Sequence, residues 1–368
     1  MLRERSLQAL GGGPGRARAT RGGNGGGHAS ILGGMALRVG VIGGGFGADV
    51  HVPGLRAEGH EVVAIATARP DRAEALARQL GIPSFTTDAL ALARRADIDL
   101  VAVVSPPTLH HDHVLAAIAA GKHVLCEKPF AASIAQARAM LEAAERAGIV
   151  HAVDHEFRYA AARSAVKERI VAGTIGEVRL VHVVTASGGT LSADEPRAAW
   201  WLRADRRGGL LGARASHWID TLRWWLGDIA RARGELRAFV PERATLEGDR
   251  LRVTSDDTCE VLLRFASGAL ATIALSNTVA AAVNRVEVHG STGALRIDGA
   301  GRLVHAPLGA PEVELLPAPG EGEQLAAYRA LVRRVTARVA GDQAAEYPTF
   351  RDGLAVQEVL EAVYADAL

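Results

Sequence analysis

The sequence of 368 residues contains very little lysine: Lys122, Lys128 and Lys167 are the only three among its 42 basic Lys and Arg residues. Arginine is a permanent cation, whereas the pKa of a lysine ammonium can be shifted so that the group exchanges a proton. Each remaining lysine is therefore of interest. Lys128 follows an apolar run at 123–127 and precedes Pro129. We interpret Lys128 as a functional residue rather than as a surface charge.

Cysteine is also scarce, since Cys126 and Cys259 are the only two, and both lie in apolar runs typical of strands. This excludes a disulfide framework and indicates buried thiols in a reducing compartment, so we expect a cytoplasmic protein. The net charge of +1 gives no reason to expect a nucleic-acid partner. No apolar run is long enough to cross a membrane, and no membrane partner is expected.

Large apolar residues are few in residues 1–34, which hold eleven glycines and five arginines. The segment has no apolar stretch of the kind found in secretory signals, and it has little serine for an organelle-targeting segment. Such a composition cannot bury enough surface to offset the entropy of ordering. We expect residues 1–34 to be a disordered extension that folding and cofactor binding do not require.

A glycine-rich turn follows the first β-rich run, residues 37–42. The turn reads Gly43-Gly44-Gly45-Phe46-Gly47-Ala48, and a helical segment follows it. In this context the first glycine permits a tight turn, Gly45 lets the backbone approach a pyrophosphate, and Ala48 lets the helix pack closely on the strand. The N-terminus of the helix offers free N–H groups to the phosphates. The pattern predicts dinucleotide binding by Gly43, Gly45, Phe46 and Gly47.

Strands and helices alternate through the first part of the chain, which predicts a doubly wound parallel sheet. The pattern changes after residue 155, where strands pair through short turns, 258–265 with 269–275 and 286–289 with 294–297. The predicted fold class is therefore α/β, with a parallel domain at 35–155 and an α+β domain at 156–368 built on a mostly antiparallel open sheet. We expect the last helix, 350–367, to pack back on this second domain.

These features resemble a known family. The matching segments are the glycine turn with His51 and Pro53, the run Ser105-Pro106-Pro107-Thr108-Leu109-His110, the run Glu127-Lys128-Pro129, and Ser216-His217 with Asp220. Over residues 35–368 the chain resembles the glucose–fructose oxidoreductase, inositol dehydrogenase and rhizopine-catabolism (Gfo/Idh/MocA) family of NAD(P)-dependent oxidoreductases. The resemblance implies a Rossmann domain and a hydride transfer between nicotinamide and a secondary alcohol or ketone of a sugar, cyclitol or related polyol.

The resemblance also implies roles for single residues. Lys128 would sit beside the nicotinamide and bind the reacting oxygen, and His217 would exchange the hydroxyl proton. Residues implied to line the cofactor are Ser105, Pro106, Pro107, His110 and Glu127. Residues implied to border the substrate are His155 and Arg158, and Trp201 is a further candidate at the substrate mouth. The family's open sheet implies a homodimer or homotetramer.

The chain departs from the family pattern at two places. The family usually has an aspartate four residues before the histidine, where this chain has Ala213. Asp220 lies three residues after His217, on the same face of a helix, so we expect Asp220 to replace that carboxylate in part. The second departure follows the second strand, where Thr67 and Arg69 stand in place of an acidic residue. A neutral hydroxyl and a guanidinium there favour NADP(H) over NAD(H), although NAD remains possible.

Other interpretations remain open. His110, His111 and His113 could suggest a metal site, but no carboxylate or cysteine cluster completes one, and no metal is expected. The loss of the family's aspartate leaves room for a dinucleotide-binding sensor without turnover. A third alternative is a redox-assisted glycosidase that retains bound NAD. The identity of the substrate and the direction of the reaction do not follow from the sequence.

Overall fold

The computed structural model describes residues 36–367, so the disorder expected for residues 1–34 lies outside the described residues. The first sheet is built from six parallel strands in the order β3-β2-β1-β4-β5-β6. These strands are β1 (Arg38–Ile42), β2 (Glu61–Ala66), β3 (Ser84–Thr86), β4 (Leu100–Val103), β5 (His123–Cys126) and β6 (His151–Val153). The parallel sheet predicted from the alternating pattern is confirmed.

Helices connect the strands of this sheet and bury both of its faces, which is why β4 is apolar and buried along its whole length. They are the π-helical turn η1 (Gly47–His51), α1 (Val52–Ala57), α2 (Pro70–Leu80), α3 (Ala89–Ala93), α4 (Pro107–Ala119) and α5 (Ile134–Ala147). Most are short and open with proline at the first turn or with a capping side chain. In α5, for example, the Ser133 hydroxyl accepts from the backbone N–H of Gln136 at 3.2 Å.

The second sheet has eight strands in the order β16-β15-β14-β13-β7-β12-β11-β8. Only the β7–β12 pair runs parallel, so the sheet is mostly antiparallel as predicted. Its strands are β7 (Val178–Ala186), β8 (Ile229–Arg237), β11 (Thr258–Phe265), β12 (Leu270–Ser276), β13 (Val283–Gly290), β14 (Gly293–Ile297), β15 (Leu303–Pro307) and β16 (Val313–Leu316). A separate hairpin pairs β9 (Glu242–Ala244) with β10 (Arg250–Arg252).

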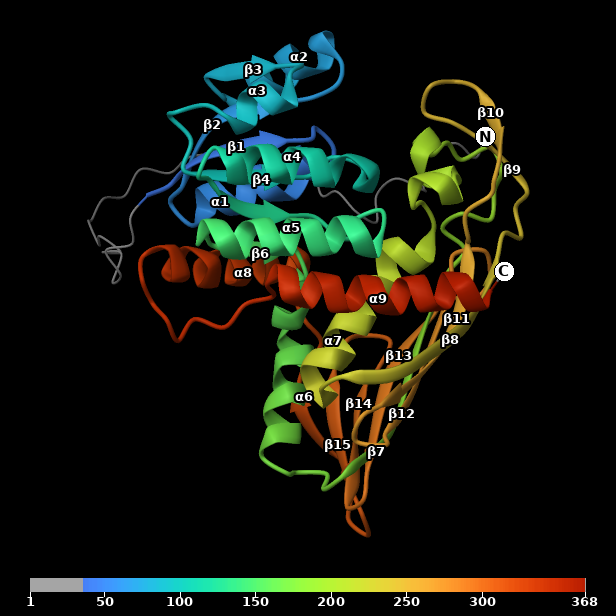
Figure 1. The fold of residues 1–368 in the computed structure, drawn as a ribbon. Coiled ribbons are helices and arrows are strands. Elements are labelled where there is room, and N and C mark those ends of the chain that lie inside the picture. The colour runs from blue at the N-terminus through green and yellow to red at the C-terminus, as the bar shows by residue number, and fades with distance from the viewer. Residues whose placement is uncertain (1–35, 368) are drawn as a thin grey trace, which may run out of the picture. The chain divides into compact units, whose positions relative to one another are not determined.

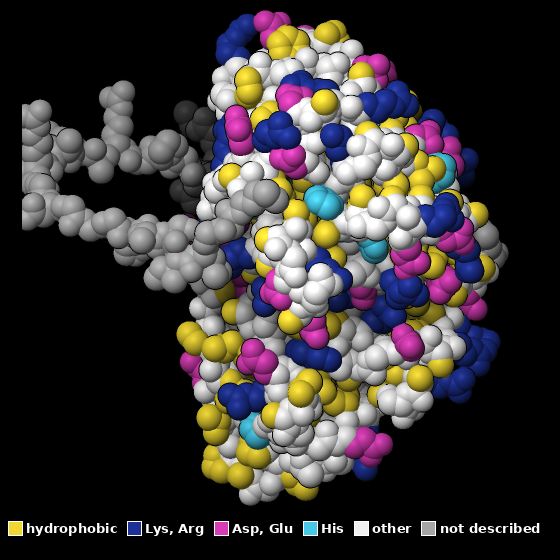
Figure 2. Space-filling model, turned by 60° about the vertical axis from the view of Figure 1, so that its left-hand side comes forward, with side chains coloured by type: hydrophobic (Ala, Val, Ile, Leu, Met, Phe, Trp, Pro, Cys, Tyr) yellow, Lys and Arg dark blue, Asp and Glu magenta, His cyan; other side chains and the backbone are white. Residues whose placement is uncertain are grey.

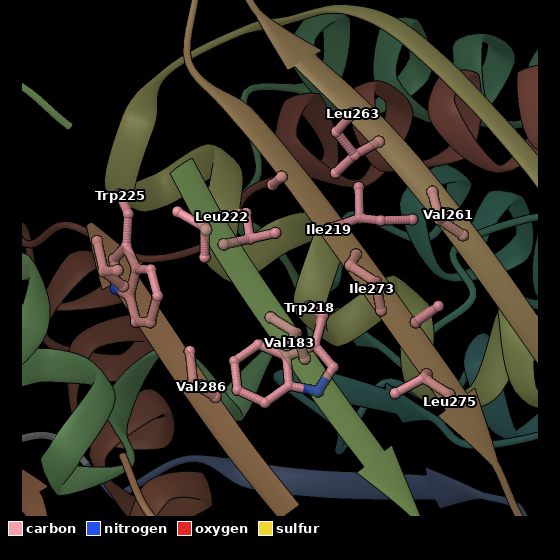
Figure 3. Close-up of a cluster of buried hydrophobic side chains, with 14 of the residues drawn as sticks. Val183, Trp218, Ile219, Leu222, Trp225, Val261, Leu263, Ile273, Leu275 and Val286 are labelled. Carbon is pink, nitrogen blue, oxygen red and sulfur yellow. The ribbon is translucent and has the colours of Figure 1, made fainter. Parts of the chain in front are cut away.

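The inner face of the second sheet packs against helix α7 (Ser216–Leu226). Figure 3 shows Trp218, Ile219, Leu222 and Trp225 of this helix lying over apolar side chains of the strands. The remaining elements of this part of the chain are η2 (Glu156–Tyr159), α6 (Ala161–Val171), η3 (Ala199–Leu202), η4 (Ala204–Arg206) and η5 (Leu211–Ala215). Strand alternation is clean in β11, where every second side chain is buried, so one face of the sheet remains open.

Two C-terminal helices pack against the first sheet, α8 (Glu323–Val339) and α9 (Phe350–Asp366) (Figure 1). Tyr328 and Leu331 of α8 belong to the same buried cluster as Val39 and Val41 of β1. Helix α9 takes part in both cores, because Phe350 is buried with the α4–α5 side of the first sheet and Val363 is buried with the second. The last helix therefore packs on the second part of the chain, as expected, and also on the first sheet, which was not expected.

Helix α9 approaches the first sheet so closely that a glycine is required. A Cβ at Gly353 would lie 2.6 Å from the Cγ2 atom of Val153 and 2.8 Å from the Cγ atom of Phe130. Gly353 therefore lets the helix backbone lie against β6 and the segment before α5.

The outer surface carries basic and acidic side chains interspersed on the face shown in Figure 2. In the described part of the chain, no helix has the length and apolar character needed to cross a membrane.

We expect Phe350→Ala to lower the free energy of unfolding by about 3–5 kcal/mol, because it removes a fully buried ring that packs 4.5 Å from the Phe130 ring. Phe239→Ala is the matched control, since that side chain is 65% exposed and its removal should change stability by less than about 0.5 kcal/mol. Urea unfolding measures both. Equal effects of the two variants would show that α9 does not stabilise the fold in this way.

Candidate active site

The glycine turn at the end of β1 has one crowded side and one open side. Gly43 has a φ of 128°, and a Cβ there would lie 2.3 Å from the Val104 carbonyl oxygen, so only glycine fits. Nothing in residues 36–367 lies within 4 Å of the position that a Cβ of Gly45 would take. This open side faces the start of a helix, where a phosphate can approach backbone N–H groups. The role of Gly43, Gly45, Phe46 and Gly47 in holding a pyrophosphate stays a prediction.

The edge of the turn carries two arginines. The Thr67 hydroxyl donates to the backbone carbonyl of Arg69 at 2.9 Å, and Arg69 itself is exposed. Arg72, which sequence reasoning missed, donates from Nη2 to the Gly44 carbonyl oxygen at 3.3 Å. No sequence signal pointed to Arg72, because the direction in which α2 leaves the sheet is visible only in the three-dimensional structure.

The loop from β4 to α4 is held in place by buried histidines. His110 is fully buried, and its two ring nitrogens lie 2.7 Å from the Ser105 carbonyl oxygen and 3.2 Å from that of Phe130. His113 Nδ1 lies 3.0 Å from the Ser105 hydroxyl. His110 was expected to line the cofactor pocket directly, and the structure corrects this. Because its ring has no free surface, it positions the segment from Ser105 to Pro107 instead.

Lys128 reaches across from the first sheet to η5, the turn that precedes α7. Its Nζ donates to the Ala213 carbonyl oxygen at 3.1 Å, and its backbone N–H donates to Glu127 Oε2 at 3.2 Å. The Lys128–Pro129 peptide bond is cis. Ala213 precedes His217 by one helical turn. The bond therefore holds the ammonium close to His217, on elements that lie 85 residues apart in the sequence.

A buried charge cluster lies behind Lys128. Nε2 of His51 is 2.9 Å from Glu127 Oε1 and 3.1 Å from Asp154 Oδ2, and its Nδ1 is 2.8 Å from the Tyr328 hydroxyl. Burial disfavours the charged imidazole, but the two carboxylates outweigh it and raise the pKa of His51 to about 9. His51 is therefore a cation at neutral pH, and both of its nitrogens donate.

The pKa values of the two carboxyl groups in this cluster are shifted in opposite directions. Burial would raise the pKa of Glu127, but the hydrogen bond from His51 and the charge of Lys128 lower it to about 2. Burial and the charge of Glu127 raise the pKa of Asp154 to about 7. His51, Glu127 and Asp154 are residue types that bind metal ions, and one ligand atom from each lies within 4.8 Å of the others. His51 is hydrogen-bonded to Glu127 and to the Tyr328 hydroxyl, whereas neither oxygen of Asp154 has a hydrogen-bond partner within residues 36–367.

His217 faces a carboxylate that the sequence analysis overlooked. Its Nδ1 lies 3.6 Å from Glu156 Oε2, and both side chains are almost completely buried. Burial, reinforced by the charge of Lys128, holds the pKa of His217 well below its usual range, so the ring is neutral at physiological pH. A neutral imidazole with one nitrogen turned to a carboxylate leaves Nε2 on the opposite side to meet a substrate hydroxyl. The signal for Glu156 was its place between His155 and Arg158.

The expected pairing of Asp220 with His217 is wrong. Asp220 Oδ2 accepts from Arg158 Nε at 2.6 Å, and Oδ1 accepts from Arg158 Nη2 at 2.5 Å. Arg158 Nη2 also donates to Asp352 at 2.9 Å. With its fork bound by two carboxylates, Arg158 joins η2 to α7 and α9 and has no free face for a substrate. This corrects the substrate-binding role expected for Arg158, because a bidentate ion pair satisfies a buried guanidinium better than an open pocket does.

The remaining predicted residues lie at different depths. His155 is buried, with its ring 5.8 Å from that of His217 and its Nε2 3.9 Å from Asp220 Oδ1. Trp201 is partly exposed and packs edge-on against Trp200, with ring centres 5.8 Å apart. The Trp201 carbonyl oxygen accepts from the Ser255 hydroxyl at 2.7 Å. Its place at the substrate mouth stays a prediction.

A dinucleotide turn beside a cationic lysine and a neutral histidine defines the class of nicotinamide-dependent oxidoreductases, since hydride transfer to or from an alcohol needs one oxygen stabilised and one proton moved. Comparisons with known proteins agree. The oxidoreductase family with an NAD-binding Rossmann fold matches residues 37–155, and the GFO/IDH/MocA C-terminal domain matches residues 164–296. The chain belongs to the Gfo/Idh/MocA oxidoreductase family.

Several relatives act on sugars, according to their names. The 1,5-anhydro-D-fructose reductase of Ensifer adhaerens is 33% identical over 281 residues, covering 73% of this chain and 76% of the relative. Levoglucosan dehydrogenase of Pseudarthrobacter phenanthrenivorans is 28% identical over 287 residues, covering 70% and 73%. A solved structure of levoglucosan dehydrogenase in complex with NADH superposes with a TM-score of 0.82 at 26% identity, covering 90% of this chain and 97% of the other.

We expect His51→Gln to destabilise the protein most at pH 6 and much less at pH 10. The pKa of His51 rises from 6.5 to about 9 on folding, so its contribution is complete below pH 6.5 and disappears as the pH rises through 9. Since one pKa unit corresponds to about 1.4 kcal/mol, the effect is at most about 3 kcal/mol.

Urea unfolding at both pH values measures the effect. His111→Gln, at a partly exposed ring on α4, is the control and should change stability by less than about 0.5 kcal/mol at either pH. A loss of stability for His51→Gln that is the same at pH 6 and pH 10 would show that His51 is not held as a buried cation.

Proposed function

We propose that this protein is an NAD(P)-dependent oxidoreductase that transfers a hydride between the nicotinamide and a secondary alcohol or ketone of a sugar, cyclitol or related polyol. One observation carries the proposal. The Lys128 ammonium is bound to the Ala213 carbonyl oxygen one helical turn before His217, which places a fixed cation and a neutral base together. Family membership supports the same chemistry.

Each residue has one task in this reaction. When bound, the nicotinamide accepts or supplies the hydride. Lys128 Nζ donates to the substrate oxygen and stabilises the negative charge that develops there. His217 Nε2 takes the hydroxyl proton in the oxidation and returns it in the reduction. The Ala213 carbonyl and Glu127 fix the lysine, so the ammonium does not have to reorganise as the charge develops.

The substrate is best sought among anhydro sugars and cyclic polyols. The relatives of this chain include enzymes named for levoglucosan and for 1,5-anhydro-D-fructose, which are both anhydro sugars. A panel of these compounds, hexoses and inositols, with each cofactor, tests the function through the absorbance of the reduced nicotinamide. Release of free sugar without net cofactor reduction would indicate a glycosidase. Dinucleotide binding without turnover of any compound would indicate a sensor.

We expect Lys128→Met to lower kcat by on the order of 100-fold while the dissociation constant of the cofactor changes little, because a donor to the developing oxyanion is lost. Lys128→Arg should not restore turnover, since the guanidinium is larger and retains its proton. Lys122→Met, just before the same strand, is the control and should be fully active. Near-normal turnover of either Lys128 variant would remove the lysine from the mechanism.

We also propose that NADP(H) is the preferred cofactor. The end of β2 carries Thr67 and Arg69 where a carboxylate would repel a 2′-phosphate, and Arg72 reaches the glycine turn from α2. Guanidinium groups bind phosphate through paired hydrogen bonds. A structure of levoglucosan dehydrogenase is a complex with NADH, the unphosphorylated form, so the preference is a property to be measured on this chain.

We expect titration to give a lower dissociation constant for NADPH than for NADH. Arg72→Met should raise the constant for NADPH by about tenfold, which corresponds to about 1.4 kcal/mol, and should affect NADH less. Arg78→Met on the same helix is the control, because that side chain is exposed and pairs with Glu74. Equal or tighter binding of NADH by the unaltered protein would contradict the preference.

We further propose that the open face of the second sheet joins copies of this chain into a dimer or tetramer. Leu262 of β11 and Leu270 of β12 are 49% and 43% exposed on neighbouring strands. Apolar side chains on an uncovered sheet face are typical of an interface. Light scattering of the purified protein gives the number of copies.

A further inference from the structure

Two buried polar atoms face each other in the site without a partner: Oε2 of Glu156 and Nδ1 of His217, 3.6 Å apart. An unsatisfied buried polar atom is costly, so two that point toward one another call for an explanation. We propose that Glu156 is the proton-relay partner of His217. It would do the work of the family's aspartate, which this chain replaces by Ala213. The inference rests on the proposed oxidoreductase function and deepens it.

The Glu156 carboxylate is held in place from the other side. Its Oε1 accepts from Gln324 Nε2 of α8 at 3.3 Å, which leaves Oε2 turned toward the histidine. The His217 ring is fixed by an edge contact with Phe157, with ring centres 4.7 Å apart. Both partners are thus positioned by packing, and a small shift would close the gap to a hydrogen bond when a substrate is bound.

No other carboxylate in residues 36–367 competes for this role. An ion pair with His217 within 4.0 Å is formed only by Glu156 in this part of the chain. Asp220, three residues after His217, is bound at both oxygens by Arg158. The proposed carboxylate therefore comes from the short η2 segment, whereas Ala213 lies in η5, just before the helix that carries the histidine.

Burial and the surrounding charges shift the pKa values of Glu156 and His217 in opposite directions. Burial raises the pKa of Glu156 well above its usual value, and the charges of Asp154 and Glu127 raise it further. Burial and the Lys128 charge lower the pKa of His217. Burial thus favours the neutral form of each group. The charged and titratable groups that act on the pair are Glu127, Lys128, Asp154, His155, Arg163, Arg214 and Tyr328.

The relay conserves protons in both directions. In the oxidation, the substrate O–H bond breaks and its proton passes to His217 Nε2, while the Nδ1 proton passes to the Glu156 carboxylate. The hydride leaves the carbinol carbon for the nicotinamide, and the substrate becomes a ketone. The reduction reverses each transfer, starting from a protonated Glu156. The oxidation therefore needs an ionised Glu156, and its rate falls as the pH falls through the apparent pKa of the pair.

Glu156→Gln tests the relay, because glutamine keeps the shape and the contact with Gln324 but cannot accept the proton. We expect kcat for oxidation to fall by on the order of 100-fold with an unchanged cofactor dissociation constant. The acidic limb of the pH–rate profile should move to lower pH, since His217 alone remains as the base. In the Glu156→Gln background, Ala213→Asp should recover at least tenfold in kcat, and Ala213→Asn, its matched control, should not.

Histidine ¹⁵N NMR of the cofactor-free protein gives a second readout. The His217 signal, identified by its loss in His217→Gln, should shift as Glu156 ionises, and this step should be missing in Glu156→Gln. The relay is overturned if the unaltered protein oxidises a substrate and Glu156→Gln does so with the same rate and pH profile. It is also overturned if the His217 titration is identical in both proteins. An unaltered protein that oxidises no substrate would instead count against the proposed function.

Discussion

His51 carries a positive charge although its side chain is completely buried, and the carboxylates of Glu127 and Asp154 hold it there. Removing an ion from water costs several kcal/mol unless its partners are close and well oriented. The four groups of this cluster come from η1, β5, β6 and α8, with Tyr328 supplying the last hydrogen bond. The cluster is stable only when these elements are assembled together, because each missing partner would leave a buried charge uncompensated.

This constraint sets the geometry of the site. His51 ends the helical turn that follows the glycine loop, and Glu127 immediately precedes Lys128. The ion pair therefore links the helical turn after the glycine loop to the segment that carries Lys128. Hydride transfer depends on how the reacting groups are oriented, so the placement of this segment bears directly on the proposed reaction.

Much of the fold could be read from local patterns. The alternation of apolar strands and helices predicted the parallel sheet, the glycine turns at Gly268 and Gly290–Gly293 predicted two hairpins, and the lone lysine at the end of β5 pointed to the site. Local spacing failed where long-range partners decided the outcome. Asp220 does share a helix with His217, but Arg158, 62 residues earlier in the sequence, binds its carboxylate. No pattern within one helix contains that information.

The same limit explains two other differences. His110 was expected at the cofactor pocket, but only the three-dimensional structure shows that its ring is buried with its two nitrogens 2.7 and 3.2 Å from backbone carbonyl oxygens. Arg72 was overlooked in favour of Arg69 because the sequence gives the distance along the chain and not the direction in which a helix leaves the sheet. The last helix was likewise expected at 350–367, but the sequence could not show that it contributes to the cores of both sheets.

Helix α9 has a consequence for how members of this family can be recombined. Its first residue is part of the core of the nucleotide-binding sheet, whereas Val363, near its end, is part of the core of the other sheet. The core around the first sheet is therefore not built from the N-terminal half alone. Helices α8 and α9, from the far end of the sequence, complete it. A chimera that joins the first 155 residues of one relative to the remainder of another would force α8 and α9 to pack on a foreign surface. A successful exchange must transfer these helices together with the N-terminal half.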